Sequence, residues 1–215
     1  MKISCIQFLY RRIPLLVFGI GCMVLISCKS KLVGEGNLIE YTKDPQHGLI
    51  QTKETGVVKT EISYRPTDQI VWQELKGMKK EMITDSLIEN KRKEYGNYYY
   101  FILSISVGDK DLLHGGSNTE EQFAENLNRL SFHMPEYTWM KAGKDTIPLA
   151  DYQFPRMYGM TKSTQVLLAF EKPEKETPEI KITLEDIGIG IGKQTFIFET
   201  KAIQSVPELD FGKKI

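Results

Sequence analysis

Cysteine is scarce in this 215-residue chain, and most of the sequence contains none. The three cysteines are Cys5, Cys22 and Cys28, all near the amino terminus. A disulfide framework or a catalytic thiol is therefore excluded for everything that follows Cys28. That remainder depends on a packed apolar core for its stability, and it is long enough to build one.

Histidine and an excess of basic charge are lacking as well. Only three histidines occur, and the 28 Lys and Arg residues balance 28 Asp and Glu residues. Three basic residues and no acids lie in residues 1–27, so the rest has 25 basic and 28 acidic residues, a net charge of −3. A mildly acidic protein has no electrostatic reason to bind nucleic acid. We therefore expect no nucleic-acid partner.

The sequence also lacks an apolar run of transmembrane length. The longest run covers residues 13–26 and follows a basic segment that contains Lys2, Arg11 and Arg12. A transmembrane helix needs roughly 20 apolar residues, so this run is too short to cross a bilayer comfortably. A basic segment followed by a short apolar run is typical of a secretory signal peptide.

Directly after the apolar run comes Leu25-Ile26-Ser27-Cys28. Together with the preceding segments this motif resembles the lipobox of bacterial lipoproteins, which the lipoprotein signal peptidase reads. The resemblance covers about 28 residues. It implies that residues 1–27 are removed and that the Cys28 sulfur takes a diacylglyceryl group, with fatty acid such as palmitate anchoring the chain to a membrane. The alternatives are an uncleaved amino-terminal anchor and twin-arginine export, which Arg11-Arg12 suggests.

The segment that follows Cys28 predicts a spacer and a destination. Residues 28–47 are polar and include Gly34 and Pro45, so we predict a flexible tether there and one β-rich domain over residues 48–215. Lys29 departs from the aspartate that retains enterobacterial lipoproteins at the inner membrane. We therefore expect an outer-membrane location.

Hydrophobic patterns predict a β-rich α+β fold for the domain. Strand patterns cover residues 58–64, 98–107, 137–141, 146–149, 165–170, 180–184 and 196–202. We predict about two helices, one from Thr67 or Asp68 to about residue 94 and one that begins at Thr119 with a capping-box pattern. Strands and helices do not alternate, so we expect an antiparallel, sandwich-like sheet.

Two glycine-rich segments are weak matches to catalytic or phosphate motifs. Residues 188–193 resemble a phosphate loop, but Ile187 and Gln194 stand where glycine and Ser or Thr are required. A bend between two strands explains this segment, and we expect no cofactor. Residues 114–117, His-Gly-Gly-Ser, are similar to a lipase oxyanion segment, yet the required G-x-S-x-G elbow is missing from the sequence.

No set of metal ligands stands out in the sequence. Asp109, Asp111 and His114 could contact a cation, but the EF-hand spacing is missing. A solvated loop over residues 109–118 is the simpler interpretation. We therefore predict no metal site.

One segment is a candidate binding surface. Tyr152, Phe154, Arg156 and Tyr158 alternate in a stretch that carries one arginine and no acid after Asp151. Tyr and Arg are enriched in interface hot spots. The alternative is that these aromatic side chains only pack against the core.

The whole chain resembles Bacteroidetes-type envelope lipoproteins, with a lipobox, a short tether and a β-rich domain. The domain ends in a Phe-x-Phe strand at Phe196 and Phe198, then the tail Val206-Pro207, Leu209 and Phe211. The resemblance implies an envelope location and no particular activity. Our first interpretation is a non-catalytic accessory or interaction subunit with an envelope protein partner.

Two alternatives stay open: a ligand-binding lipoprotein with an aromatic pocket, and a hydrolase. A concave aromatic pocket would favour ligand binding, and converging His, Ser and acidic side chains would favour a hydrolase. A convex domain with one exposed apolar patch would favour the interaction subunit.

Overall fold

The computed structural model describes residues 32–156 and 160–212. The predicted signal peptide, the predicted lipidation site at Cys28 and the candidate Tyr158 lie outside these residues. Within them, no helix combines the length and the apolar character that a bilayer span requires.

Eleven strands and seven α-helices make up the described residues. The strands are β1 (Leu32–Val33), β2 (Ile50–Thr55), β3 (Val58–Arg65), β4 (Tyr98–Val107), β5 (Lys110–Asp111), β6 (Thr138–Ala142), β7 (Asp145–Gln153), β8 (Thr164–Glu171), β9 (Glu179–Leu184), β10 (Gln194–Glu199) and β11 (Glu208–Leu209). The helices are α1 (Glu35–Lys43), α2 (Thr67–Leu75), α3 (Asp85–Tyr95), α4 (Leu112–Gly115), α5 (Glu120–Phe132), α6 (Met134–Tyr137) and α7 (Thr200–Gln204), with 3₁₀ turns η1 (Pro45–His47) and η2 (Lys80–Met82).

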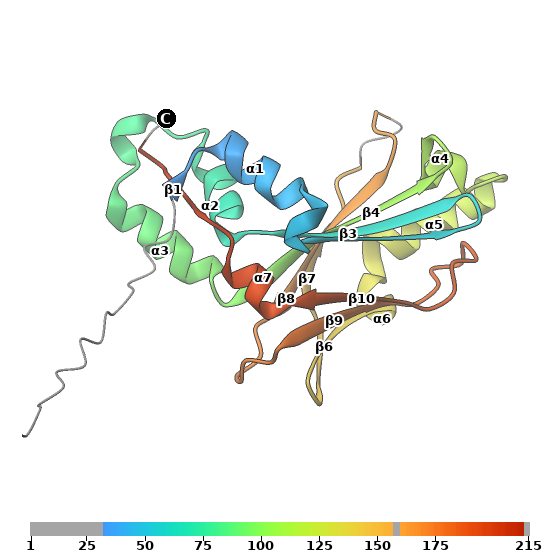
Figure 1. Ribbon diagram of the computed structural model, residues 1–215. Helices are drawn as coiled ribbons and strands as arrows, with labels where there is room; N and C mark the ends of the chain where they lie inside the picture. Colours follow the sequence, from blue (N-terminus) through green and yellow to red (C-terminus); the bar gives the residue numbers. More distant parts are fainter. Residues whose placement is uncertain (1–31, 157–159, 213–215) are drawn as a thin grey trace, which may run out of the picture.

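Nine of the strands form one antiparallel sheet that curls until its ends nearly meet. The order is β10-β9-β6-β7-β8-β4-β3-β2, with β5 attached to β4. The two edge strands approach each other, and Gln194 Nε2 in β10 donates a hydrogen bond of 3.4 Å to Thr55 Oγ1 in β2. Figure 1 shows β3 and β4 above β9 and β10. The predicted β-rich α+β class with an antiparallel, sandwich-like sheet is confirmed.

The main core fills the inside of this curled sheet. Side chains in a strand point alternately to the two faces, so Phe101 and Leu103 of β4 point inward and are fully buried. The Phe101 ring lies 5.0 Å from that of Phe198, 5.5 Å from Tyr64 and 6.4 Å from Phe170. The same alternation places the other side chains of β4 on the outer face of the sheet.

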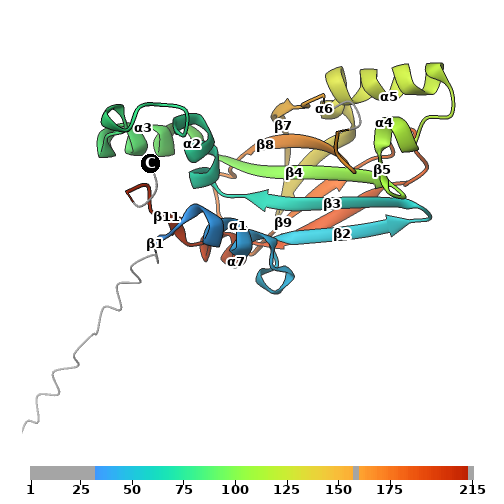
Figure 2. The same ribbon diagram turned by 90° about the horizontal axis from the view of Figure 1, so that it is seen from above.

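A second, smaller core holds together the helical lobe, by which we mean α1, α2, α3, β1 and β11. Its buried side chains are Leu38, Val71, Leu75, Ile88, Leu209 and Phe211. The lobe joins the start and the end of the described chain, because β1 pairs in parallel with β11. Figures 1 and 2 show it at the opposite end of the sheet from α5.

Asp68 connects three elements of the helical lobe, although the sequence predicted it as a helix cap. Pro66 is the residue that precedes α2, and no side chain caps that helix. Asp68 instead accepts hydrogen bonds from Arg92 Nε at 2.8 Å and Arg92 Nη2 at 2.9 Å. It also accepts one from the Leu209 backbone N–H at 2.7 Å. The side chain thus joins α2, α3 and β11.

The predicted number of two helices is wrong, since the described residues contain seven. Helices α4, α6 and α7 have only four or five residues, too few to show a helical period. The long helix predicted from residue 67 is interrupted after Leu75, where Gly77 follows. It resumes at Asp85, with the Thr84 hydroxyl accepting the Leu87 N–H at 3.2 Å.

The prediction of a flexible tether over residues 28–47 does not hold for its described part. Residues 32–47 form β1, α1 and η1, and Leu38 of α1 is fully buried in the helical lobe. Two glycines at the amino-terminal end of α1, Gly34 and Gly36, and a polar sequence hide the helix. It is stabilised by burial against distant residues, which local composition does not reveal.

Candidate functional site: a tyrosine-lined groove

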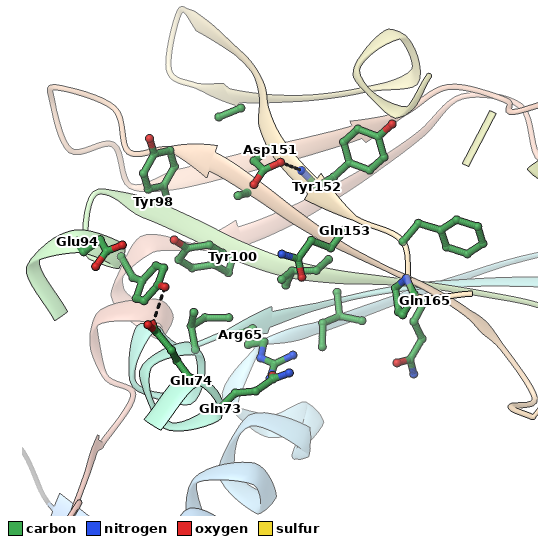
Figure 3. Close-up of a pocket in the computed structure, with 18 residues that line it drawn as sticks. Arg65, Gln73, Glu74, Glu94, Tyr98, Tyr100, Asp151, Tyr152, Gln153 and Gln165 are labelled. Atoms are coloured by element: carbon green, nitrogen blue, oxygen red, sulfur yellow. Dashed lines mark hydrogen bonds between the residues drawn. The ribbon is translucent and has the colours of Figure 1, made fainter. Parts of the chain in front are cut away.

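A groove of about 1120 Å³ lies on the outer face of the sheet, beside the helical lobe (Figure 3). Its floor is formed by outward-facing side chains of neighbouring strands. Tyr100 is paired with Arg65 of β3 on one side and with Ala169 of β8 on the other. Ile102 and Leu167 form the next pair along the floor. Paired residues share a face of the sheet, so register alone brings these side chains together.

Helices α2 and α3 supply one wall of the groove. Tyr95 donates a hydrogen bond of 2.6 Å to Glu74, and Lys91 lies 2.8 Å from the same carboxylate. The hydrogen bonds from Lys91 and then Tyr95 lower the pKa of Glu74, whereas the bond to Glu74 raises the pKa of Tyr95 to about 12. The Glu74 carboxylate on this wall therefore already has its partners.

Three tyrosines form an aromatic cluster in the groove. The ring of Tyr100 lies 6.3 Å from that of Tyr95 at 71° and 6.2 Å from that of Tyr98 at 46°. Burial, followed by the nearby phenols, raises the pKa of Tyr100 to about 12. The phenols of Tyr95 and Tyr100 therefore stay neutral at physiological pH. The Tyr100 hydroxyl can offer a donor to a bound molecule, and both residues offer an apolar ring, because the Tyr95 hydroxyl already donates to Glu74.

Arg65 contributes a positive charge to the groove and forms no ion pair with a described carboxylate. Its Nη2 donates to Gln73 Oε1, while its Nε is buried and has no hydrogen-bond partner. No carboxylate in the described part of the chain forms an ion pair with it. Burial lowers the pKa of Arg65, yet a guanidinium stays charged in proteins.

Two of the predicted binding-surface residues, Tyr152 and Phe154, are among those that line the groove, whereas Arg156 is not. The Tyr152 hydroxyl donates to the Ser131 carbonyl at 2.8 Å, and Phe154 packs against the main core. Arg156 reaches Ser131 Oγ at 3.5 Å. Figure 3 shows the Tyr152 ring turned away from Tyr100 and Arg65.

Two further groove residues of β7, Asp151 and Gln153, were not predicted from the sequence. They pair with Ala169 and Leu167 and so share the groove face. A register shift between Leu149 and Asp151 sets which face each side chain takes. From the sequence, only a signal for that bulge could have predicted that Asp151 and Gln153 point to one face of β7 and Tyr152 to the other.

The glycine-rich bend predicted at residues 188–193 is confirmed, and it already holds an anion. Asp186 Oδ1 accepts the N–H groups of Gly188, Ile189 and Gly190 at 2.8–3.1 Å, and its Oδ2 accepts that of Gly192 at 3.2 Å. Burial alone would raise the pKa of Asp186, but these backbone donors outweigh it and lower the pKa. The loop's own carboxylate occupies the place a phosphate would take.

The histidines of the described residues have structural partners. His114 Nδ1 lies 2.8 Å from Asp111 Oδ2, and Asp111 Oδ1 also caps α4 through the Leu113 N–H at 3.0 Å. His133 pairs with Glu136 at 2.7 Å. Across residues 32–156 and 160–212, no three His, Cys, Asp or Glu side chains converge as metal ligands.

A scan against protein-family models finds no match, and a search of curated proteins finds none either. Among solved structures, the chain is similar to the crystal structure of a DUF4426 family protein from Pseudomonas aeruginosa PAO1. The two share 13% identity, over 70% of this chain and 91% of that one, with a TM-score of 0.34.

Proposed function

We propose that this chain is a non-catalytic, lipid-anchored binding protein of the bacterial envelope that holds a ligand in the tyrosine-lined groove. The observation that carries the proposal is the half-buried Arg65, which lines a concave site and forms no ion pair with any described residue. The lipobox at residues 25–28 and Lys29 support anchoring at Cys28 in the outer membrane. The partners of the protein are then a membrane and the bound ligand.

The groove favours ligand binding over the interaction subunit that the sequence suggested first. Concave sites with a few polar groups aimed inward suit a small molecule or a polymer segment, whereas protein partners commonly use flatter surfaces. A hydrolase is less well supported. In the described residues the histidine rings are hydrogen-bonded to a backbone carbonyl or to a carboxylate, and none to a serine or threonine hydroxyl.

The anchor is tested by Cys28→Ala. We expect this variant to lose palmitate labelling and to accumulate as an unprocessed precursor, because the acyl chains need the Cys28 sulfur and amine. The measurement is metabolic labelling followed by mass spectrometry of the amino terminus. A Cys22→Ala variant is the matched control and should be labelled and cleaved normally. Normal labelling of Cys28→Ala would refute the anchor.

The groove is tested by filling it. Gln153→Trp places a large ring over the groove from an exposed position of β7, and Thr146→Trp puts the same ring on an exposed position of β7 outside the groove. We expect material that co-purifies with the native lipidated chain to fall roughly tenfold in Gln153→Trp, which corresponds to ~1.4 kcal/mol.

The Thr146→Trp control should recover the same co-purifying material as the unmodified chain. Mass spectrometry of the bound fraction gives the comparison. Equal recovery with both tryptophan variants would show that ligand capture does not use the groove.

A further inference from the structure

We propose that the groove binds an acidic sugar chain and that Arg65 pairs with its carboxylate. The inference rests on the proposed function, since it assigns a ligand class to the same groove. Three observations carry it: the unpaired guanidinium, the polar and aromatic lining, and the absence of a free strand edge on the groove floor.

Arg65 has the geometry and the unused hydrogen-bond donors to bind a carboxylate. A guanidinium has five N–H donors in a planar fork that matches a carboxylate with two parallel hydrogen bonds. Gln73 Oε1 accepts from Nη2 and Nε is buried, so Nη1 and the second hydrogen of Nη2 are the donors left for a ligand. A desolvated charge without a counter-charge is unfavourable, so an incoming anion stabilises this arrangement.

The acids that line the groove do not supply that anion. Glu74 is hydrogen-bonded to Lys91 and Tyr95, and Glu94 pairs with Lys91 at 2.8 Å. Asp151 accepts the Tyr152 backbone N–H at 2.8 Å. Figure 3 places Glu94 and Asp151 on the far side of Tyr100 from Arg65. Of the three acids, only Glu74 lies on the Arg65 side of Tyr100, and it is paired with Lys91 and Tyr95.

The lining favours a sugar over a fatty acid. A fatty acyl chain requires a continuous apolar wall, but here Gln73, Gln153 and Gln165 interrupt it with amides. Sugar hydroxyls can exchange hydrogen bonds with such amides, while the C–H face of a sugar ring packs on an aromatic ring. The half-buried rings of Tyr95 and Tyr98 offer such faces.

The floor also disfavours a peptide that binds as an added strand. Strand addition needs unpaired backbone groups at a sheet edge. The floor strands β3, β4 and β8 each have a neighbour on both sides, so their backbone groups are already used. A volume of about 1120 Å³ exceeds the roughly 300–1,000 Å³ of typical small-ligand pockets, which suits a chain of several sugar rings.

The test compares two probes of similar size on the full lipidated chain in detergent micelles. Trigalacturonate carries three carboxylates, and its methyl ester carries none. By isothermal titration, we expect trigalacturonate to bind roughly tenfold or more tightly than the ester, as expected for a desolvated charge pair. Equal affinity for the two probes, or binding of neither, would overturn the inference.

Variants tie the preference to Arg65. Arg65→Gln should abolish the preference for the acid, and Arg65→Lys should retain part of it because the charge stays while the fork is lost. Arg156→Gln, at an exposed arginine outside the groove lining, should leave it unchanged. Thermal unfolding of each variant confirms that it is folded. An undiminished preference in folded Arg65→Gln contradicts the assignment.

Hexaglutamate distinguishes an acidic peptide from an acidic sugar. If it binds more tightly than trigalacturonate in an Arg65-dependent manner, the sugar assignment is wrong and a peptide takes its place. If no sugar binds while Gln153→Trp still loses its co-purifying material, this inference fails and the proposed function stands. If no sugar binds and Gln153→Trp keeps its co-purifying material, both this inference and the proposed function fail.

Discussion

Asp68→Ala is expected to lower the free energy of unfolding by about 3 kcal/mol, the lower end of the range for breaking a buried ion pair. The substitution leaves Arg92 without its bidentate partner and the Leu209 N–H without its acceptor. The lower end applies because the Arg92 side chain is still 25% exposed. The helical lobe should loosen first, since Asp68 joins α2, α3 and β11.

Urea denaturation and hydrogen exchange of the lobe amides give the measurement. The matched control is Glu89→Ala, which removes the other acid on Arg92, bonded to Nη1 at 2.9 Å. The Glu89 side chain is 58% exposed, so its loss should change the free energy of unfolding by less than about 1 kcal/mol. Similar losses in the two variants would show that Asp68 has no special role.

Phe101→Ala is expected to lower the free energy of unfolding by about 3–5 kcal/mol, because a fully buried aromatic ring leaves both lost transfer energy and a cavity. The ring contacts side chains of β3, β8 and β10, namely Tyr64, Phe170 and Phe198. It thus bridges parts of the sheet that are distant in the strand order.

Chemical denaturation of the lipidated chain in detergent checks this value. Ile197→Ala removes an apolar side chain that is 44% exposed on β10, and the loss should be within about 1 kcal/mol. A small effect of Phe101→Ala would mean that the sheet does not close around a common core.

Local patterns predicted the elements that local chemistry stabilises. The capping-box pattern at Thr119 marks the start of α5, where the Thr119 hydroxyl accepts the Gln122 N–H at 3.2 Å. The strand patterns predicted at 137–141 and 146–149 correspond to β6 and β7, which are joined through Gly143, whose φ of 59° suits glycine. Strand β2 was missed because exposed polar side chains, such as Lys53 and Glu54, mask its alternation.

The groove could not be predicted because it depends on register between distant strands. In the sequence, Arg65 is only the last residue of an alternating strand. It meets Tyr100 and the helical wall because β3 and β4 pair in one particular register, and a shift of one residue would turn it to the opposite face. For the same reason, residue type alone selected Tyr152 and Phe154 as candidate binding residues. The bulge in β7 directs Asp151 and Gln153 to the groove.

The parallel pairing of β1 with β11 has a mechanical consequence. If Cys28 carries lipid as proposed, four residue steps separate it from Leu32, a reach of at most about 14 Å. The helical lobe then stands next to the lipid headgroups. Any tension on the anchor would load the β1–β11 pair in shear and pass through Leu209 to Asp68. Force applied to the anchor would therefore unfold the helical lobe, which walls the groove, before it unfolds the sheet. The bound ligand would then dissociate while the sheet is still folded.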